Sequence, residues 1–228
     1  MFAAEIAAPR TRFGAGTIVA TPSALDRTMG AGSVRRLESK EHVFCEGDPR
    51  RHVFRIEEGV VAIYKTLNDG RRQIVDFAYP GDLIGLGTLK EHVLSAQTTC
   101  EAKVRCLSAA TLEREAENDP ELALKLYKSV SQELAATRSL LVSVGQRSAI
   151  ERVSLFLLSL YRRPGAHEDT AVHLSMLRSD IADLLGLTIE TVSRTLTKLR
   201  TMGVIELQQG GTVVTLADLA RLTSLANE

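Results

Sequence analysis

The most regular pattern of apolar and polar positions lies near the end of the chain, over residues 178–199. Apolar residues recur there at spacings of three and four, the period of amphipathic helices, in two short runs. Gly186 separates the runs and can take a left-handed C-cap conformation, and Thr188 is a suitable N-cap for the second helix. The positions expected to face inward are Ile181, Leu184 and Leu185 in the first helix and Ile189, Val192, Leu196 and Leu199 in the second.

The outer face of the second helix is polar and carries Glu190, Ser193, Arg194, Thr197 and Lys198. A helix lying in the major groove of DNA needs such acceptor, hydroxyl and cationic groups. On periodicity alone, a merely solvated face is an equally good interpretation. The next segment favours DNA, because two β-rich runs flank Gly210-Gly211 and predict a hairpin with a primed turn. A hairpin directly after a recognition helix is a wing, so the pattern predicts a winged helix-turn-helix.

Residues 33–117 show short β-rich runs separated by glycines, with a sharp hairpin signal at Asn68-Asp69-Gly70. Turn signals roughly every 8 to 12 residues indicate an antiparallel sandwich or barrel rather than a parallel sheet. Residues 1–32 have little periodicity and are expected to form a partly ordered extension. The expected strands cover residues 42–45, 53–56, 60–64, 73–77 and 104–107.

A long helix is expected over residues 118–147, because Asn118-Asp119-Pro120-Glu121 combines a cap, an early proline and a first-turn acid. An a/d seam of the coiled-coil kind runs along it, and we favour a symmetric dimer through this helix. The alternative is a helix packed only on its own sheet, which Leu122, Leu126 and Leu140 would serve. The seam consists of Tyr127, Val130, Leu134, Thr137, Leu141 and Val144.

Gly145 and Gln146 allow a break before a further helix over residues 149–162, and residues 163–169 are expected to form a surface loop. The expected fold class is therefore α+β, with an N-terminal antiparallel β-domain, a long dimerisation helix and a C-terminal winged helix-turn-helix. The expected divisions are an extension (1–32), the β-domain (33–117), the dimerisation helix (118–147) and the DNA-binding domain (148–228).

The composition limits the number of domains and the class of protein but predicts no further helices or strands. The chain has 228 residues, 44% of them hydrophobic, with a formal net charge of +0, which suits one large or two ordinary domains. No apolar run approaches the roughly 18 to 20 residues of a membrane span, and residues 1–20 lack a signal-peptide core. We expect a cytoplasmic protein without a membrane partner. DNA contacts then depend on local placement of Arg178, Arg194, Lys198 and Arg200, and modest contacts per subunit suit a dimer.

From Ser33 onward the order of parts resembles the CRP/FNR superfamily of bacterial transcription regulators, and the resemblance implies that the N-terminal antiparallel domain is a β-roll. The most specific piece is Glu190-Thr191-Val192-Ser193-Arg194, similar to the E-x-x-S-R motif of the FNR and FixK branches, and the preceding residues 180–188 look most like the FixK type. The resemblance implies a homodimer on double-stranded DNA, at a palindrome of the TTGAT-N4-ATCAA kind. It also implies activation through RNA polymerase, with low-oxygen or nitrogen-fixation genes as suggested targets.

The base-reading residues are expected to be Glu190, Ser193 and Arg194. Arg194 can donate two hydrogen bonds to guanine, Glu190 can accept from cytosine, and Ser193 can contact a base edge or a thymine methyl. The alternative for Glu190 is an ion pair with Arg194 within the helix, worth roughly 0.2 to 0.5 kcal/mol. Phosphate contacts are expected from Arg178, Ser179, Thr188, Thr191 and Lys198.

The sensory half departs from its better-known relatives. No cysteine precedes Cys45, so three ligands of the iron–sulfur cluster of FNR proteins are missing, and Cys106 is expected to be a buried apolar residue. Cyclic-AMP-binding members carry a glutamate and an Arg-Ser pair where this chain has Leu86-Gly87 and Leu94-Ser95. We therefore expect no cofactor and activity without a cyclic nucleotide.

One alternative keeps the fold but makes it gated, through a β-roll ligand or through Cys45, Cys100 or Cys106. An enzyme of the cupin type would need converging metal ligands. Only His42, His52 and His92 lie in the roll and no H-x-H spacing occurs, so we expect no enzyme.

Overall fold

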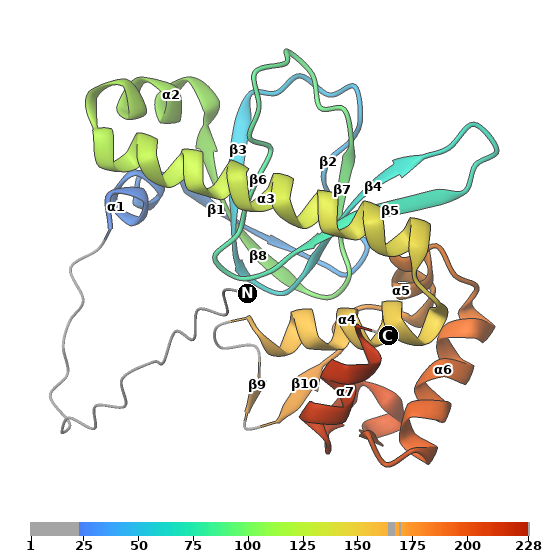
Figure 1. Ribbon diagram of the computed structural model, residues 1–228. Helices are drawn as coiled ribbons and strands as arrows, with labels where there is room; N and C mark the ends of the chain where they lie inside the picture. Colours follow the sequence, from blue (N-terminus) through green and yellow to red (C-terminus); the bar gives the residue numbers. More distant parts are fainter. Residues whose placement is uncertain (1–22, 164–166, 169, 228) are drawn as a thin grey trace, which may run out of the picture.

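The computed structural model describes residues 23–163, 167–168 and 170–227. A β-roll forms one half of the molecule, a long helix runs along it, and a C-terminal domain of helices with a small sheet lies below (Figure 1). The predicted fold class is confirmed. The expected extension lies mostly outside the described residues.

The β-roll consists of two antiparallel four-stranded sheets with the strand orders β1-β8-β3-β6 and β2-β7-β4-β5. Apolar side chains between the sheets, among them Phe54, Ile56 and Val104, form its core. The five expected strands match β2, β3, β4, β5 and β8, whereas β1, β6 and β7 were not predicted, because they are short or polar. The bounds are β1 Ser33–Leu37, β2 His42–Phe44, β3 His52–Glu58, β4 Val61–Thr66, β5 Arg72–Ala78, β6 Leu83–Ile84, β7 Ser95–Thr98 and β8 Ala102–Ser108.

The predicted β4–β5 hairpin is present. Thr66 pairs with Arg72, and the amide of Leu67 donates to the carbonyl of Arg71 at 2.8 Å. Gly70 takes a φ of 83°, which glycine adopts without steric cost. Strand β5 contacts α5, which makes Arg72, at the start of this strand, available to the C-terminal domain.

Two helices that flank the roll were not predicted. Helix α1 (Ala24–Gly30) lies in the segment expected to be an extension, and a capping box between Ser23 and Asp26 starts it. Helix α2 (Ala109–Asn118) follows β8 within the range assigned to the roll. Both are short, and their few apolar residues show no sustained period. They are stabilised by packing against the fully buried Leu122 of the long helix.

The long helix is α3 (Pro120–Gln146), and its N-cap is Asp119, whose side chain accepts from the amides of Glu121 and Leu122. The expected break follows it at Arg147, which is extended. Ser148 and Glu151 then form a capping box that starts α4 (Ala149–Tyr161). The positions of both helices agree with the sequence-based prediction.

Five residues of the predicted seam lie exposed on α3. The exposed fraction reaches 69% at Tyr127 and 74% at Leu141, and it is 49% at Leu134. Val144 differs, because it is half buried beside the C-terminal domain. An added side chain at Gly186 would lie 3.1 Å from Val144 Cγ1.

The C-terminal domain combines a helix pair with a four-stranded antiparallel sheet of order β11-β12-β10-β9. The segment expected to be a loop contains the short strand β9, whose backbone pairs with β10. No helix among the described residues is long and apolar enough to cross a membrane. The bounds are β9 His167–Glu168, β10 Ala171–His173, α5 Arg178–Leu185, α6 Ile189–Thr201, β11 Ile205–Gln208, β12 Val213–Leu216 and α7 Leu219–Leu225.

One apolar core joins the two halves of the chain. Ile74 and Phe77 of β5 belong to the same buried cluster as Phe156 and Leu157 of α4. The rings of Phe77 and Phe156 lie 6.5 Å apart, centroid to centroid. The C-terminal domain is therefore packed directly on the roll rather than tethered to it.

Candidate nucleic-acid interface

Local sequence signals build the turn between α5 and α6. Gly186 ends α5 in the left-handed conformation, with φ 62° and ψ 41°, and the amide of Leu187 donates to the carbonyl of Ala182 at 3.0 Å. The hydroxyl of Thr188 accepts from the amide of Thr191 at 3.2 Å and caps α6. Both predicted caps are therefore present.

The apolar faces of the two helices meet in the core, with one exception. Ile181 is 1% exposed, and Val192 and Leu199 are fully buried. Ile189, which was predicted to face inward, is 47% exposed. It is the first residue of α6, and side chains in a helix lean toward its N-terminus, so Ile189 extends past the end of α5 and finds no partner there.

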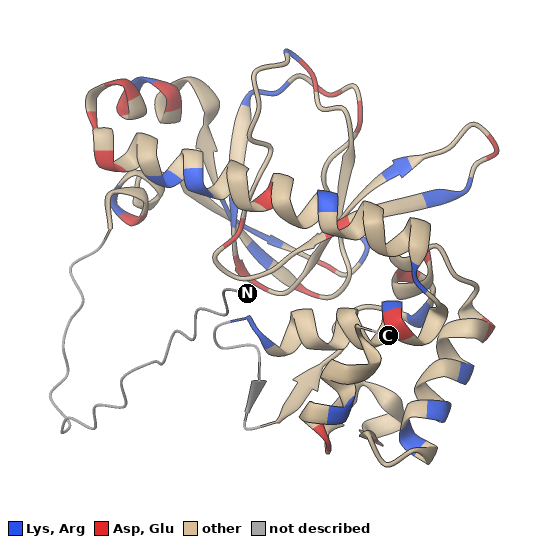
Figure 2. Cartoon of the chain, viewed as in Figure 1, with Lys and Arg blue, Asp and Glu red and all other residues tan. Residues whose placement is uncertain are grey.

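The opposite face of α6 is open to solvent. Glu190, Ser193 and Arg194 are all exposed, as are Thr197 and Lys198. Figure 2 shows basic residues along α6 at the lower right, away from the β-roll. Within the described part of the chain, Arg194 has no ion pair within 4.0 Å, so the intrahelical pair with Glu190 does not form. The arginine side chain is thus unengaged on the reading face.

Glu190 lies in the first turn of α6, where the helix N-terminus favours negative charge. Its own backbone amide and the hydroxyl of Thr188 bond to the carboxylate and lower its pKa below the ordinary value. Glu190 is therefore an ionised hydrogen-bond acceptor at neutral pH, the form required to accept from a base amino group.

The wing is formed by β11 and β12, an antiparallel pair in which Ile205 lies opposite Leu216 and Gln208 lies opposite Val213. The predicted primed turn is present at its centre, because Gly210 (φ 68°, ψ 15°) and Gly211 (φ 91°) take positive φ and the amide of Thr212 donates to the carbonyl of Gln209 at 3.4 Å. Gln209, Gly210 and Gly211 all take positive φ, and residues 209–212 form a longer connection. A groove of about 300 Å³ separates the wing from α6, lined by Ser193, Thr197 and Arg200 among others.

Arg178 holds this wing. It is half buried, and its Nη2 donates to the carbonyl of Gly211 at 2.5 Å. Burial lowers the pKa of its guanidinium, which nevertheless stays charged. The sequence suggested a phosphate contact for this residue, but the structure gives it a backbone partner across the wing.

The other predicted phosphate-contacting residues are spread over the turn and α6. Thr188 and Lys198 are exposed, and Thr191 is half buried, with its hydroxyl 3.0 Å from that of Thr188. Ser179 is half buried and borders a cavity of about 220 Å³ between α5 and the β-roll. The first three therefore surround the reading face, whereas Ser179 lies toward the roll.

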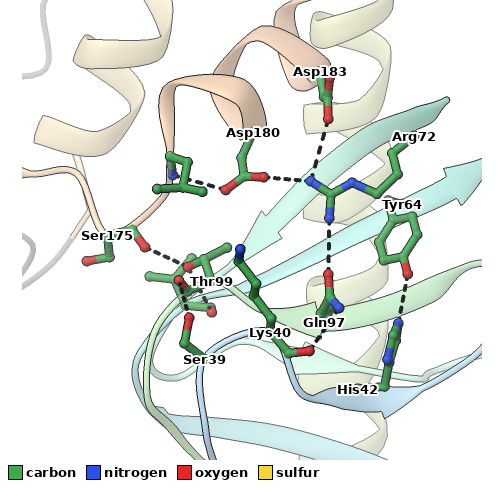
Figure 3. A network of polar contacts seen from close by, with 12 residues as sticks. Ser39, Lys40, His42, Tyr64, Arg72, Gln97, Thr99, Ser175, Asp180 and Asp183 are labelled. Atoms are coloured by element: carbon green, nitrogen blue, oxygen red, sulfur yellow. Dashed lines mark hydrogen bonds and ion pairs between the residues drawn. The ribbon is translucent and has the colours of Figure 1, made fainter.

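Polar contacts that no sequence pattern indicated hold α5 against the roll (Figure 3). Arg72 of β5 donates to Asp180 at 2.6 Å and lies 3.5 Å from Asp183. The side-chain amide of Gln73 donates to the carbonyl of Asp183 at 2.5 Å. Thr99 donates to the carbonyl of Ser175 at 2.7 Å, just before α5. The first helix of the pair is thus fixed from the roll side.

The cofactor positions considered from the sequence have other contacts. Ser95, of the pair Leu94-Ser95, is 7% exposed, and its hydroxyl accepts from the amide of Glu46 at 3.0 Å. Cys106 is half buried rather than fully buried, and burial raises the pKa of its thiol. Among the described residues, no group of three or more His, Cys, Asp or Glu side chains is placed to hold a metal.

Comparison with known proteins supports the interpretation of both halves. Residues 151–225 match the Crp-like helix-turn-helix domain, and residues 34–119 match the cyclic nucleotide-binding domain. The nitrogen fixation regulation protein FixK of Bradyrhizobium diazoefficiens is 40% identical over 90% of this chain and 90% of its own. FixK of Azorhizobium caulinodans is 40% identical over 82% of this chain and 76% of its own.

A solved structure is also similar. FixK2 from Bradyrhizobium japonicum superposes with a TM-score of 0.82 at 35% identity, covering 86% of this chain and 97% of its own. A roll of the cyclic nucleotide-binding type, followed by a helix-turn-helix with a wing, defines a DNA-binding transcription regulator. The chain belongs to the CRP/FNR family of bacterial transcription regulators and, within it, to the FixK type. Regulators of this family bind DNA and act as dimers, and the relatives found are regulators rather than enzymes.

Proposed function

We propose that the chain is a transcription activator that binds, as a homodimer, a palindromic operator of the TTGAT-N4-ATCAA kind and contacts RNA polymerase. The observation that carries the proposal is the exposed face of α6, which presents Glu190, Ser193 and Arg194 to solvent, with Ser193 bordering the groove beside the wing. These three side chains offer an acceptor, a hydroxyl and a two-pronged donor on one helical face. Such a set reads a short run of base pairs in the major groove.

Each reading residue has a role that follows from its chemistry. Arg194 donates to O6 and N7 of guanine, Glu190 accepts from the cytosine amino group, and Ser193 contacts the neighbouring pair. Phosphate contacts are proposed for Arg178, Ser179, Thr188, Thr191 and Lys198, which position the helix without specifying sequence. Arg178 has a second role in this scheme, because its bond to Gly211 also orients the wing.

Dimerisation is proposed through the exposed apolar row of α3. Tyr127, Val130, Leu134 and Leu141 are each 48 to 74% exposed in the single chain. A row of this kind on one helix is stabilised when a second copy covers it symmetrically. Thr137 and Val144 complete the proposed seam. The proposed division at 118–147 therefore assigns α3 to dimerisation and the two flanking segments to the roll and DNA binding.

Activity without a cyclic nucleotide or an iron–sulfur cluster is part of the proposal. Leu94 stands where a cyclic phosphodiester would need an arginine, and without that charge partner such a ligand lacks its main anchor. The names of the FixK relatives support nitrogen-fixation genes as targets, with low-oxygen respiration genes as a related group.

The experiment is a gel shift with the purified apo protein and a TTGAT-N4-ATCAA duplex. Tight and specific binding without any additive supports the proposal. Binding that requires cell extract or reductant supports instead a gated regulator that uses a roll ligand or Cys45, Cys100 or Cys106. No preference over a scrambled duplex under either condition contradicts both.

A further inference from the structure

Among the side chains by which the β4–β5 hairpin contacts the DNA-binding domain, Arg72 has several polar partners. Its Nη2 donates to Asp180 Oδ1 at 2.6 Å and lies 3.5 Å from Asp183 Oδ2. Its Nη1 donates to Gln97 Oε1 at 3.1 Å. Figure 3 shows the guanidinium between the carboxylates of α5 and the amide of the roll. Arg72 therefore joins two domains with both ends of its charged group.

The roll holds this arginine in place before α5 is considered. Gln97 is itself fixed, because its amide donates to the carbonyl of Lys40 at 2.9 Å. The guanidinium carbon lies 5.2 Å from the ring centroid of Tyr64, a cation–π distance. The hydroxyl of Tyr64 is hydrogen-bonded to His42 Nε2 at 2.8 Å. A side chain held by both Gln97 and Tyr64 loses little freedom when it meets a further partner.

The partner carboxylates set the position of α5. The side chain of Asp180 is only 9% exposed, and its second oxygen accepts from the amide of Leu177 at 3.0 Å, which caps the start of the helix. Asp183 lies one turn later on the same face. An unbroken chain of contacts thus runs from the roll through Arg72 to the N-terminus of the first helix of the pair.

Orientation matters because a dimer must place two copies of α6 in successive major grooves, about 34 Å apart. The roll and α3 carry the proposed dimer seam, whereas α5 and α6 carry the reading face. The angle between these parts decides the distance between the two reading helices. The contact leaves the exposed face of α6 uncovered, so it does not mask DNA binding.

We propose that Arg72 is a positioning residue for operator binding: by bonding Asp180 and Asp183, it fixes the angle of the DNA-binding domain and thereby the half-site spacing that the dimer accepts. The inference rests on the proposed operator binding and adds a specific residue of the roll to it. Arg72 takes the place that an effector would have in a gated regulator, since it supplies the domain orientation from within the chain.

The test compares wild type with Arg72→Gln on duplexes in which the two half-sites are separated by three, four, five or six base pairs, using fluorescence anisotropy. We expect Arg72→Gln to bind the four-base-pair spacer about tenfold more weakly and to lose most of its preference among spacers. Affinity for a duplex with a single half-site should stay unchanged. A merely structural role would lower the active fraction for every duplex alike and leave the spacer preference intact.

Arg71→Gln is the matched control. Arg71 is the neighbouring arginine of the same hairpin, but it pairs with Asp69 inside the hairpin at 2.7 Å and is 78% exposed. Its variant loses the same charge and should behave as wild type. Arg72→Lys should keep more of the spacer preference than Arg72→Gln does. A lysine can reach one carboxylate of α5, but it cannot bond Gln97 at the same time.

The double variant Asp180→Asn/Asp183→Asn decides the matter if Arg72→Gln does not fold, because it removes both charge partners of Arg72. The asparagine oxygen at position 180 can still accept from the amide of Leu177 and keep the helix cap. Relaxed spacer preference in a folded dimer of this variant supports the inference, and wild-type preference overturns it. In a folded Arg72→Gln dimer, unchanged affinity and spacer preference overturn it directly. Failure of wild type to bind any of these duplexes would instead contradict the proposed function.

Discussion

Replacing Arg194 by alanine tests the assignment of the reading face most directly. Arg194 is exposed on α6 and makes no ion pair within the described residues, so its removal leaves folding almost unchanged, within about 0.5 kcal/mol. The variant therefore loses free energy of DNA binding and almost none of folding. A two-pronged contact with guanine discriminates by about 1 to 3 kcal/mol, and a dimer carries two of them. The expected cost is therefore about 2 to 6 kcal/mol, or about 30-fold to 20,000-fold in operator affinity.

The assay is fluorescence anisotropy at one fixed salt concentration, with the palindrome and with a version in which both half-site guanines are replaced. Wild type should prefer the guanine operator strongly, and Arg194→Ala should bind the two nearly alike. Lys198→Ala is the contrasting variant, because a phosphate contact weakens binding to all sequences equally and lowers the salt slope. If Arg194→Ala keeps the wild-type preference for guanine, the proposed reading face is wrong.

Three further predictions concern stability and assembly. Leu134→Asp should give monomers in sedimentation while leaving the helix content unchanged, whereas Gln132→Asp, one helical face away, should stay dimeric; a dimeric Leu134→Asp would contradict the seam. Burial raises the pKa of Asp76 from 3.8 to about 6; Asp82 and Glu133 nearby also raise it, and Arg163 lowers it. The folded state therefore binds the proton of Asp76 more tightly than the unfolded state does, and the free energy of unfolding falls as pH rises through about 6. Asp76→Asn should therefore stabilise the protein by about 2 kcal/mol in urea at pH 7.5 and hardly at all at pH 4, after allowance for residual exposure; a destabilised variant at pH 7.5 would refute this. Gly186→Ala should lower the free energy of unfolding by more than Gly203→Ala, about 2 against 1 kcal/mol, because both adopt positive φ but only Gly186 faces Val144 at 3.1 Å; equal losses would count against that contact.

The sequence predicted those parts of the fold that local patterns control. The helix pair, its caps at Gly186 and Thr188, and the break after α3 follow from residues within one or two helical turns of each other. Ile189 was misplaced because the period gives a direction around a helix but does not show where the neighbouring helix ends. Helices α1 and α2 were missed because tertiary packing on Leu122, rather than their own pattern, stabilises them.

Contacts between distant segments could not be predicted in this way. Arg72 and Asp180 are 108 residues apart, and Arg178 and Gly211 are 33 apart, and neither pair leaves a trace in local periodicity. The exposed face of α6, by contrast, was predicted residue by residue, because polarity and helical spacing together specify which side chains avoid the core.

The core shared by β5 and α4 bears on how the protein is made. Ile74 and Phe77 are fully or almost fully buried only when Phe156 and Leu157 cover them. About 80 residues separate the two groups in the chain, so during synthesis the second group follows the first by about 4 to 16 seconds. For that interval the nascent roll presents an apolar face to solvent. Chaperone capture and aggregation compete with folding there, and substitutions in α4 should reduce the yield of soluble protein even when the roll itself is untouched.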